Sequence, residues 1–447
     1  MSEQSTLTYA RVNEDVIKML DKPTVKWLAL FIPTLGFVGF GLFCFLHQVY
    51  TGLGVAGYRH PVFWGVYITD FVFWVGIAHS GTLISAILFL FRANFRMSIY
   101  RIAEAMTVFA VLTAGLFPII HLGRPWNFYW LFPYPNQREL WVNFKSPLLW
   151  DVFAVSTYLT VSSLFFFVGM IPDIAAIRDR VKEVPRKIAY SVLSLGWKGS
   201  NWEWLHYTRA YLFFAAFATP LVLSVHSVVS WDFAMSNLPG WHTTIFAPYF
   251  VAGAIFSGLG MVITLTVPIR KIFHLESYIT LDNYDGMAKL IILTSSIVGY
   301  AYGVEFFLAW YSGSPYEWGQ FYYRATGQYA IFYWIMVVCN VIIPIPLWFK
   351  AVRRNIKVLF IISIFINIGM WFERFNIIVI SLSEGFDPAA WGIYMPSWVE
   401  IGITVGSFAW FFMFFLIFIK TLPAVSIAEM KEILPMPNKG IKGDHSG

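Results

Sequence analysis

Ten apolar stretches, each long enough to cross a lipid bilayer, constrain the fold of this chain more than any other feature. A membrane-spanning helix needs about 20 consecutive, mostly apolar residues. Charged residues make up only 13% of the chain, against about 25% in soluble proteins. We therefore predict an all-α polytopic membrane protein with ten transmembrane helices. The expected spans are residues 27–49, 63–91, 102–122, 147–171, 210–230, 245–269, 290–312, 328–348, 358–383 and 398–419.

The distribution of lysine and arginine predicts how these spans are oriented. Of the 31 basic residues, 25 lie in the two terminal tails and the even-numbered connections, and 5 lie in the odd-numbered connections. Arg374 lies inside a span. Because basic residues concentrate on the cytoplasmic side, both termini are predicted to be cytoplasmic. The net charge of +6 therefore indicates membrane orientation, and no nucleic-acid partner is expected.

A recurring pattern of small residues predicts the internal organisation. Spans two and six each carry a glycine followed closely by a serine–glycine pair, at Gly76, Ser80 and Gly81 and at Gly253, Ser257 and Gly258. This weak repeat favours two four-helix bundles, spans two to five and six to nine, with the first and tenth spans peripheral. The alternative is chance, since such patterns are common in membrane helices. The predicted units are a tail (1–26), a first half with the functional site (27–230), a second half (231–421) and an extended tail (422–447).

Candidate reactive residues gather at the outer ends of three spans. His121 ends the third span, Asp151 lies in the first turns of the fourth, and Asp232 follows the fifth. An imidazole and a carboxylate at the edge of the hydrocarbon can accept protons, as a site that oxidises a lipid-soluble hydroquinone requires. Arg124 and Trp126 add a cation and an aromatic ring at the same level. Each residue alone also has a structural explanation, such as an N-cap for Asp151.

Other ionisable residues lie deeper in the spans, where burying each costs roughly 2.5 to 3.5 kcal/mol. They are Asp70, His79 and Glu104 in the first half and Glu305, Glu373 and Arg374 in the second. His79 is in addition a candidate contact to the hydroquinone. The simplest interpretation of Glu305 and Arg374 is a structural ion pair across the second bundle. The alternative is that these six groups form a proton path.

The chain is expected to bind no redox cofactor of its own and no metal. The four intramembrane histidines lie on four different helices: His47, His79, His121 and His226. A di-haem cytochrome b instead carries two ligands on each of two helices. Cys44 and Cys339 lie in separate apolar spans, which does not suit an iron–sulfur cluster or a structural zinc site. A redox function would therefore need cofactors on partner chains.

Four segments give the chain a family resemblance. At "AHSGTLISAILFLFR", "AEAMTVFAVLTAGLFPIIHLGRPW", "SPLLWDVFAVSTY" and "HSVVSWDFA" it resembles the NrfD family, the membrane subunits related to polysulfide reductase. It looks most similar to the quinol-oxidising NrfD-like subunit of alternative complex III. The resemblance implies a menaquinol site near the outer face of a bacterial cytoplasmic membrane, with the site histidine at His121, an aspartate at Asp151 and, less directly, one at Asp232. It also implies three partners: an iron–sulfur subunit at the outer face, multihaem c-type cytochromes and a second NrfD-like subunit.

Three other functions remain open. A membrane anchor or quinone subunit of a molybdopterin oxidoreductase of the polysulfide reductase type would share most of these features. A secondary transporter would also have ten helices and buried charges, but its site should lie near the bilayer midplane. A purely structural anchor would need no converging ionisable groups. Quinone bound to the purified protein would distinguish a quinol-oxidising subunit from a transporter or a structural anchor. A quinol-oxidising subunit could in addition couple its reaction to proton translocation.

Overall fold

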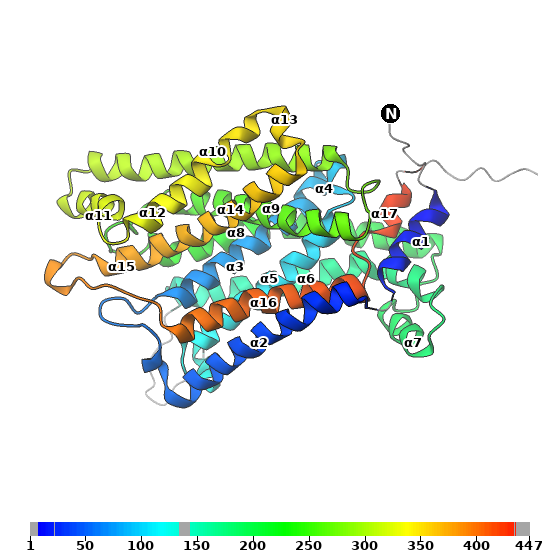
Figure 1. Cartoon of the computed structure of the whole chain (residues 1–447), viewed down its shortest axis with the longest axis horizontal. Coiled ribbons are helices and arrows are strands. Elements are labelled where there is room, and N and C mark those ends of the chain that lie inside the picture. The colour runs from blue at the N-terminus through cyan, green and yellow to red at the C-terminus, as the bar shows by residue number, and fades with distance from the viewer. Residues whose placement is uncertain (1–7, 22, 134–143, 433, 435–447) are drawn as a thin grey trace, which may run out of the picture.

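The chain folds into long helices that lie side by side (Figure 1). The computed structural model describes residues 8–21, 23–133, 144–432 and 434. Within these residues, ten helical stretches are long and apolar enough to cross a membrane, which confirms the predicted number. They are α2 (Val25–Thr51), α3 (Val66–Thr82) with η2 (Leu83–Ile87) and α4 (Leu88–Leu90), α5 (Tyr100–His121), α6 (Pro147–Arg178), α8 (Asn201–Ala234), α9 (Phe246–Ile272), α10 (Leu281–Tyr311), α12 (Ala330–Val337) with η5 (Val338–Ile342) and η6 (Ile345–Trp348), α14 (Ile356–Phe375) with η7 (Asn376–Ile380) and α15 (Ser381–Ser383), and α16 (Trp398–Thr421).

Shorter helices lie at the ends of these spans. They are α1 (Tyr9–Met19), η1 (Leu53–Val55), η3 (Asn94–Arg96), η4 (Pro125–Leu131), α7 (Val184–Leu193), α11 (Pro315–Thr326), α13 (Lys350–Arg353), η8 (Pro388–Ala390) and α17 (Ile427–Glu432). Extended pairing in the described part of the chain is limited to an isolated bridge between Arg59 and Val62. The protein is therefore all-α, as predicted.

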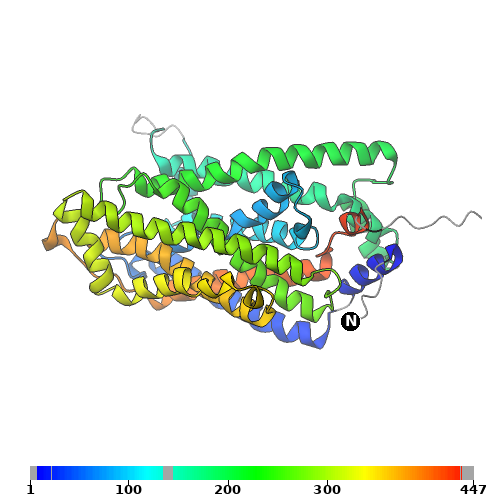
Figure 2. The ribbon, with the colours of Figure 1, turned by 90° about the horizontal axis from the view of Figure 1, so that it is seen from above.

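The spans form two bundles and an outer pair. Helices α3, α5, α6 and α8 pack together as the first bundle, and α9, α10, α12 and α14 form the second. The two bundles meet where α3 packs against α9. Helix α2 pairs with α16 outside them (Figure 1). In Figure 2 the green helix α8 runs along one long side of the molecule and the yellow helices of the second bundle along the other. This arrangement agrees with the predicted fold class.

Glycines set the distance between the central helices and within the outer pair. A Cβ atom on Gly258 of α9 would lie 2.7 Å from the carbonyl oxygen of Ile77 in α3. A Cβ atom on Gly41 of α2 would lie 2.6 Å from the Cα of Gly406 in α16. Neither position can hold a larger residue unless the backbones separate. The two small-residue patterns that suggested an internal repeat lie on α3 and α9, the helices that join the bundles.

The first and last described helices, α1 and α17, lie at the same end of the molecule, which we name the terminal end (Figure 1). Helices α1 and α17 pack against each other there, and Lys431 donates a hydrogen bond to Asn13 at 2.7 Å. The prediction of an extended tail from residue 422 is wrong for residues 427–432, which form α17. The physical reason is that Ile427 and Met430 are buried against the bundle. Residues 433 and 435–447 of that predicted tail lie outside the described part of the chain. The other end of the molecule is named the opposite end.

Candidate functional site

Two aspartates from neighbouring helices face each other at the opposite end of the first bundle. Pro147 begins α6 and places Asp151 at its fifth residue, while Asp232 lies in the last turn of α8. The two carboxyl groups are within hydrogen-bonding reach of each other. The Oδ1 atom of each is buried without a hydrogen-bond partner among the described residues. Because two ionised carboxylates repel, a proton shared between them stabilises the pair. The pair can therefore take up and release a proton.

A pocket at the same end of the molecule is lined by the residues that precede the two aspartates in the sequence. The residues that precede the aspartates, Trp150 and Trp231, form part of its wall, with ring centroids 5.9 Å apart and nearly perpendicular planes. The Trp150 indole N–H donates to the Phe144 carbonyl oxygen at 2.6 Å, which fixes that ring. The pocket encloses about 510 Å³, a volume typical of small-molecule sites. We name it the tryptophan pocket. Its other lining residues are Ala234, Met235, His242, Thr243, Thr244 and Ala247.

His121 has a different partner from the one expected. It is the last residue of α5, and its Nδ1 atom lies 3.2 Å from the hydroxyl oxygen of Tyr58. Tyr58 in turn stacks on Tyr394, which donates a hydrogen bond to Glu400 at the start of α16. The direct pairing of His121 with Asp151 is therefore replaced by two separate pairs, one of His121 with Tyr58 and one between the two aspartates. His121 lies at the same end of the molecule as the aspartates.

Arg124 and Trp126 lie on the surface just beyond His121. Gly123, with a φ of +70°, turns the chain out of α5 and into η4. Arg124 is exposed, and 60% of the Trp126 surface is accessible. Both residues are thus at the predicted level, but they face outward from the bundle. Their position suits a contact with lipid or a partner chain at this end.

Two histidines meet in the centre of the first bundle. His79 of α3 and His226 of α8 are buried, with ring centroids 4.5 Å apart. His79 Nδ1 lies 3.0 Å from the carbonyl oxygen of Val75, one turn earlier in α3. Neither ring nitrogen of His226 has a hydrogen-bond partner among the described residues. Asp70 is separate from this pair, because its carboxylate accepts hydrogen bonds from Trp371 and Thr404 and so ties α3 to α14 and α16.

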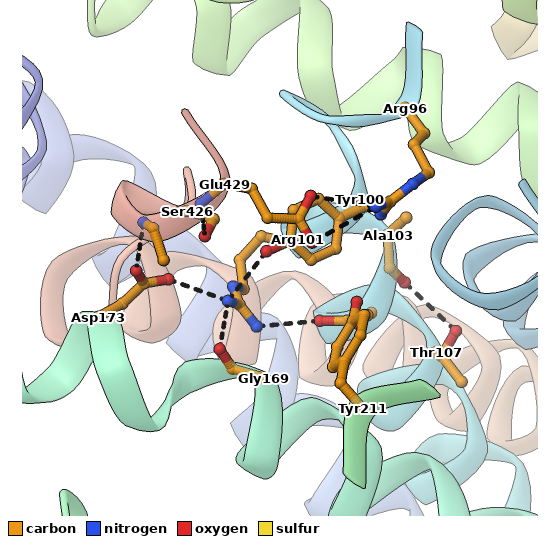
Figure 3. Close-up of polar contacts among 12 residues, drawn as sticks. Arg96, Tyr100, Arg101, Ala103, Thr107, Gly169, Asp173, Tyr211, Ser426 and Glu429 are labelled. Atoms are coloured by element: carbon orange, nitrogen blue, oxygen red, sulfur yellow. Dashed lines mark hydrogen bonds and ion pairs between the residues drawn. The ribbon is translucent and has the colours of Figure 1, made fainter. Parts of the chain in front are cut away.

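Glu104 belongs to a buried charge cluster at the terminal end. Arg101 contacts Glu104 at 3.1 Å and Asp173 at 2.9 Å, and Figure 3 shows the contact with Asp173. Nearby, Arg96 pairs with Glu429 of α17 at 3.2 Å. Three carboxyl groups and two guanidinium groups thus hold the ends of α5, α6 and α17 together. This cluster lies at the end of the molecule away from the tryptophan pocket.

The predicted ion pair between Glu305 and Arg374 is wrong. Arg374 contacts the neighbouring Glu373 at 3.0 Å, and its guanidinium lies 4.3 Å from the centre of the Phe250 ring. The cation that acts on Glu305 is Arg324 of α11. Glu305 and Glu373 themselves lie in the predicted spans, on α10 and α14. The error arose because depth alone does not show which face of a helix a side chain occupies.

Sequence reasoning missed the contact between Asp151 and Asp232, although the chain carries a signal for it. A Trp–Asp dipeptide occurs at the opposite end of α6 and again at the opposite end of α8, as Trp150–Asp151 and Trp231–Asp232. Two identical dipeptides at one end of two neighbouring helices indicate paired positions. Tyr58 carried no such signal, because it lies in the connection before α3.

The site is built from side chains, and no group of three or more His, Cys, Asp or Glu in the described part of the chain is arranged to hold a metal ion. A family model described as "Polysulphide reductase, NrfD" matches residues 54–383, well over half of the chain. The chain belongs to the NrfD family. The matched stretch runs from η1 to α15, so it covers both four-helix bundles and leaves out the outer pair of α2 and α16.

Two curated relatives of this NrfD-family chain are archaeal. One, from Halobacterium salinarum, is described as a putative membrane subunit of a dimethyl sulfoxide reductase, and it is 25% identical over 82% of this chain and 84% of its own length. The other is an Hdr-like menaquinol oxidoreductase integral membrane subunit from Archaeoglobus fulgidus, 20% identical over 73% of this chain and 72% of its own length. Both matches extend over most of each protein, so they compare whole membrane subunits.

Proposed function

We propose that this subunit binds a menaquinol-type hydroquinone in the tryptophan pocket and oxidises it, with Asp151 and Asp232 as proton acceptors. The observation that carries the proposal is the buried carboxyl pair whose preceding residues, Trp150 and Trp231, form a wall of that pocket. Two indole rings can pack against a flat quinol ring. Carboxyl oxygens without partners can accept hydrogen bonds from its hydroxyl groups.

Each oxidised hydroquinone releases two protons and two electrons. In this proposal the carboxyl pair takes the first proton, and the second goes to the pair again or to His121, whose Nδ1 faces the Tyr58 hydroxyl. Arg124, exposed at the same end, adds positive charge to that end of the molecule. General-base catalysis of this kind contributes typically about 10²- to 10⁴-fold in rate. The protons leave at the opposite end, which the distribution of basic residues predicts to be the outer face.

The electrons pass to a partner chain docked at the opposite end. Cys44 on α2 and Cys339 on η5 are both buried and lie on separate helices, so they do not form a ligand set for a cluster. We propose an iron–sulfur subunit as the first acceptor, multihaem c-type cytochromes as the next, and a second NrfD-like subunit in the same complex, as in alternative complex III. The menaquinol oxidoreductase named among the relatives supports the quinol class.

A second candidate is supported by the other relative. Its name, which places it in a dimethyl sulfoxide reductase, favours a membrane subunit that delivers quinol electrons to a molybdopterin reductase. The site chemistry would be the same, and only the acceptor chain would differ. Purification of the complex from its host membrane and identification of its subunits distinguishes the two: co-purified multihaem cytochromes support alternative complex III, and a molybdopterin subunit supports the second candidate.

The proposal predicts that Asp151→Asn and Asp232→Asn each lower quinol oxidation by about 100-fold or more, because the amide cannot accept the quinol proton. The measurement is the rate of menaquinol oxidation by the purified complex, together with the amount of complex assembled. Asp387→Asn is the matched control, since Asp387 is an exposed aspartate at the same end. Rates near that of the control in both variants would remove the carboxyl pair from the mechanism.

A further inference from the structure

A second pocket lies next to the tryptophan pocket, on the second bundle. It encloses about 360 Å³ between the segment after α8, the end of α10 and helix α11. Its apolar wall includes Leu308 and Phe321, and its polar groups include Glu305, Glu317 and Thr243. We name it the glutamate pocket. Its volume falls within the range of small-molecule sites.

A firmly held segment separates the two pockets. Residues 242–244 line both of them, so this segment forms the common wall. Just before it, the Trp241 indole N–H donates to the Ile377 carbonyl oxygen at 2.6 Å. The Gly240 backbone N–H donates to the Glu317 carboxylate at 2.9 Å. Because these bonds reach both α11 and η7, the wall is anchored to the second bundle. The glutamate pocket therefore shares a firmly anchored wall with the tryptophan pocket.

Glu305 supplies the recognition group of the glutamate pocket. Its side chain lines the pocket and the residue is only 6% exposed. Its Oε1 atom has no hydrogen-bond partner among the described residues, and the same is true of the Thr243 hydroxyl. A buried acceptor of this kind is costly unless a donor reaches it. The free oxygen of Glu305 therefore indicates a ligand that donates a hydrogen bond.

The charges around the pocket favour a neutral ligand over a cation. Arg324 is 3% exposed and acts electrostatically on Glu305 more strongly than Glu373 does with the opposite sign, so the carboxylate already has a positive group nearby. Glu317 is the other acidic residue of the lining, and its carboxylate already accepts a hydrogen bond from the Gly240 backbone N–H. A neutral hydroxyl group can donate a hydrogen bond to the Glu305 Oε1 atom without adding charge to the protein interior.

The shape of the pocket favours a flat ring that arrives from the bilayer. The Phe321 ring is buried between the Arg324 guanidinium, 4.5 Å from its centre, and the Phe306 ring, 5.1 Å away. On the other side, Leu308 and Tyr311 are 41% and 73% exposed on the outward face of α10. The pocket thus combines a rigid aromatic floor with an apolar rim on a membrane-spanning helix.

We propose that the glutamate pocket is a second hydroquinone-binding site, in which Glu305 accepts a hydrogen bond from a ring hydroxyl group. The ligand class rests on the function proposed above, because it is the same lipid-soluble diol. The protein then holds two quinone molecules, one on each side of residues 242–244. A second molecule so close to the first keeps the tryptophan pocket supplied.

The test counts quinones bound to the purified protein. Protein reconstituted in lipid nanodiscs with menaquinone-4 is washed and extracted, and menaquinone and phospholipid are quantified per chain. Glu305→Leu removes the hydrogen-bond acceptor, and Leu308→Trp fills the pocket at a half-exposed position that tolerates a larger side chain. We expect two menaquinones per chain in the unmodified protein and one in each variant. Leu293→Trp, at an exposed position elsewhere on α10, is the matched control and should keep two.

Met235→Trp separates this inference from the proposed function, because Met235 lines only the tryptophan pocket of the two. If Met235→Trp loses one menaquinone while Glu305→Leu and Leu308→Trp lose none, the glutamate pocket is not a quinone site. The tryptophan pocket then remains the quinone site. The reverse pattern would support the glutamate pocket and contradict the tryptophan pocket. Loss of phospholipid without menaquinone in Leu308→Trp would identify the occupant as a lipid and refute a hydroquinone site.

Discussion

At the scale of single residues, Arg374 shows how this protein stabilises a charge inside the second bundle. Its side chain is 1% exposed, and Glu373 beside it is fully buried. The two groups contact each other at 3.0 Å, the guanidinium lies over the Phe250 ring, and Tyr302 donates a hydrogen bond to Glu373. Each charge is thus compensated by the other. Removal of one partner leaves the other uncompensated, which costs about 3 to 5 kcal/mol.

Single substitutions of this pair should therefore be more damaging than the double substitution. Glu373→Leu or Arg374→Met alone is expected to lower the amount of assembled protein and its unfolding temperature in detergent. The Glu373→Leu, Arg374→Met double variant should recover most of both, because apolar residues of similar size can replace a buried ion pair at little cost. Equal losses in the singles and the double would show that the pair does not act as a compensating unit.

Sequence reasoning placed the ionisable groups on the correct helices, but it missed most partners. Successive helical residues point about 100° apart, since 3.6 residues make one turn. A one-residue change therefore turns a side chain from one neighbouring helix to another. Span length places a residue along the bilayer normal and carries no information on this rotation. His121 and Glu305 were thus assigned to the correct helix end and to the wrong partner.

At the scale of elements, the short helix α17 closes the terminal end of the first bundle. The Ala428 N–H donates to the Asp173 carboxylate at 2.9 Å, and Glu429 reaches Arg96 (Figure 3). Ile427 and Met430 are almost fully buried. Burial raises the pKa of the Glu429 carboxyl above its ordinary value, even though Arg96 and Arg101 oppose that shift. The ionised form is therefore disfavoured on balance, so the burial of Ile427 and Met430 contributes to holding α17 in place beside these polar contacts.

This balance predicts opposite effects for two substitutions in α17. A carboxyl group with a raised pKa in the folded state contributes stability below the unfolded value, about 4.3 for glutamate, and loses it as the pH rises. Glu429→Gln should therefore match the unmodified protein near pH 4.3 and be the more stable of the two at pH 8. Ile427→Ala should be destabilised at both pH values by roughly 2 to 5 kcal/mol, through the cavity it creates.

The measurement is the unfolding temperature in detergent as a function of pH. Glu432→Gln is the matched control, because Glu432 lies in the same helix and is exposed. A lower unfolding temperature for Glu429→Gln at pH 8 would mean that the ion pair with Arg96 outweighs the cost of burial. The existence of the ten spans was predictable from apolar length, although α8 and α10 each begin nine residues before the predicted start. Helix α17 is too short and too polar to show such a signal.

At the scale of the whole molecule, the two four-helix bundles form a unit to which an outer pair is added. The NrfD family match ends before α16 and begins after α2, so the shared part is the eight central helices. Helices α2 and α16 approach each other closely at Gly41 and Gly406. The Thr404 hydroxyl of α16 donates a hydrogen bond to Asp70 of α3, which connects the outer pair to the bundles. The number of spans and their division into two bundles were predictable from the sequence. The length of the apolar stretches, the distribution of basic residues and the small-residue patterns are each properties of whole spans.

The orientation of this unit in the membrane is the remaining prediction of the sequence, and it determines on which side the proposed site lies. If the 25 basic residues of the tails and even-numbered connections face the cytoplasm, α7 is cytoplasmic and the connection after α15 is external. A cysteine in place of Asp387 should then react with an impermeant maleimide added to intact cells. A cysteine in place of Ser191 should react only after the cells are opened. Both positions are exposed, and the native Cys44 and Cys339 are buried, so background labelling should be low. Labelling of the Ser191 position in intact cells, with protection of the Asp387 position, would reverse the orientation and place both pockets and the proton-accepting pair on the cytoplasmic side.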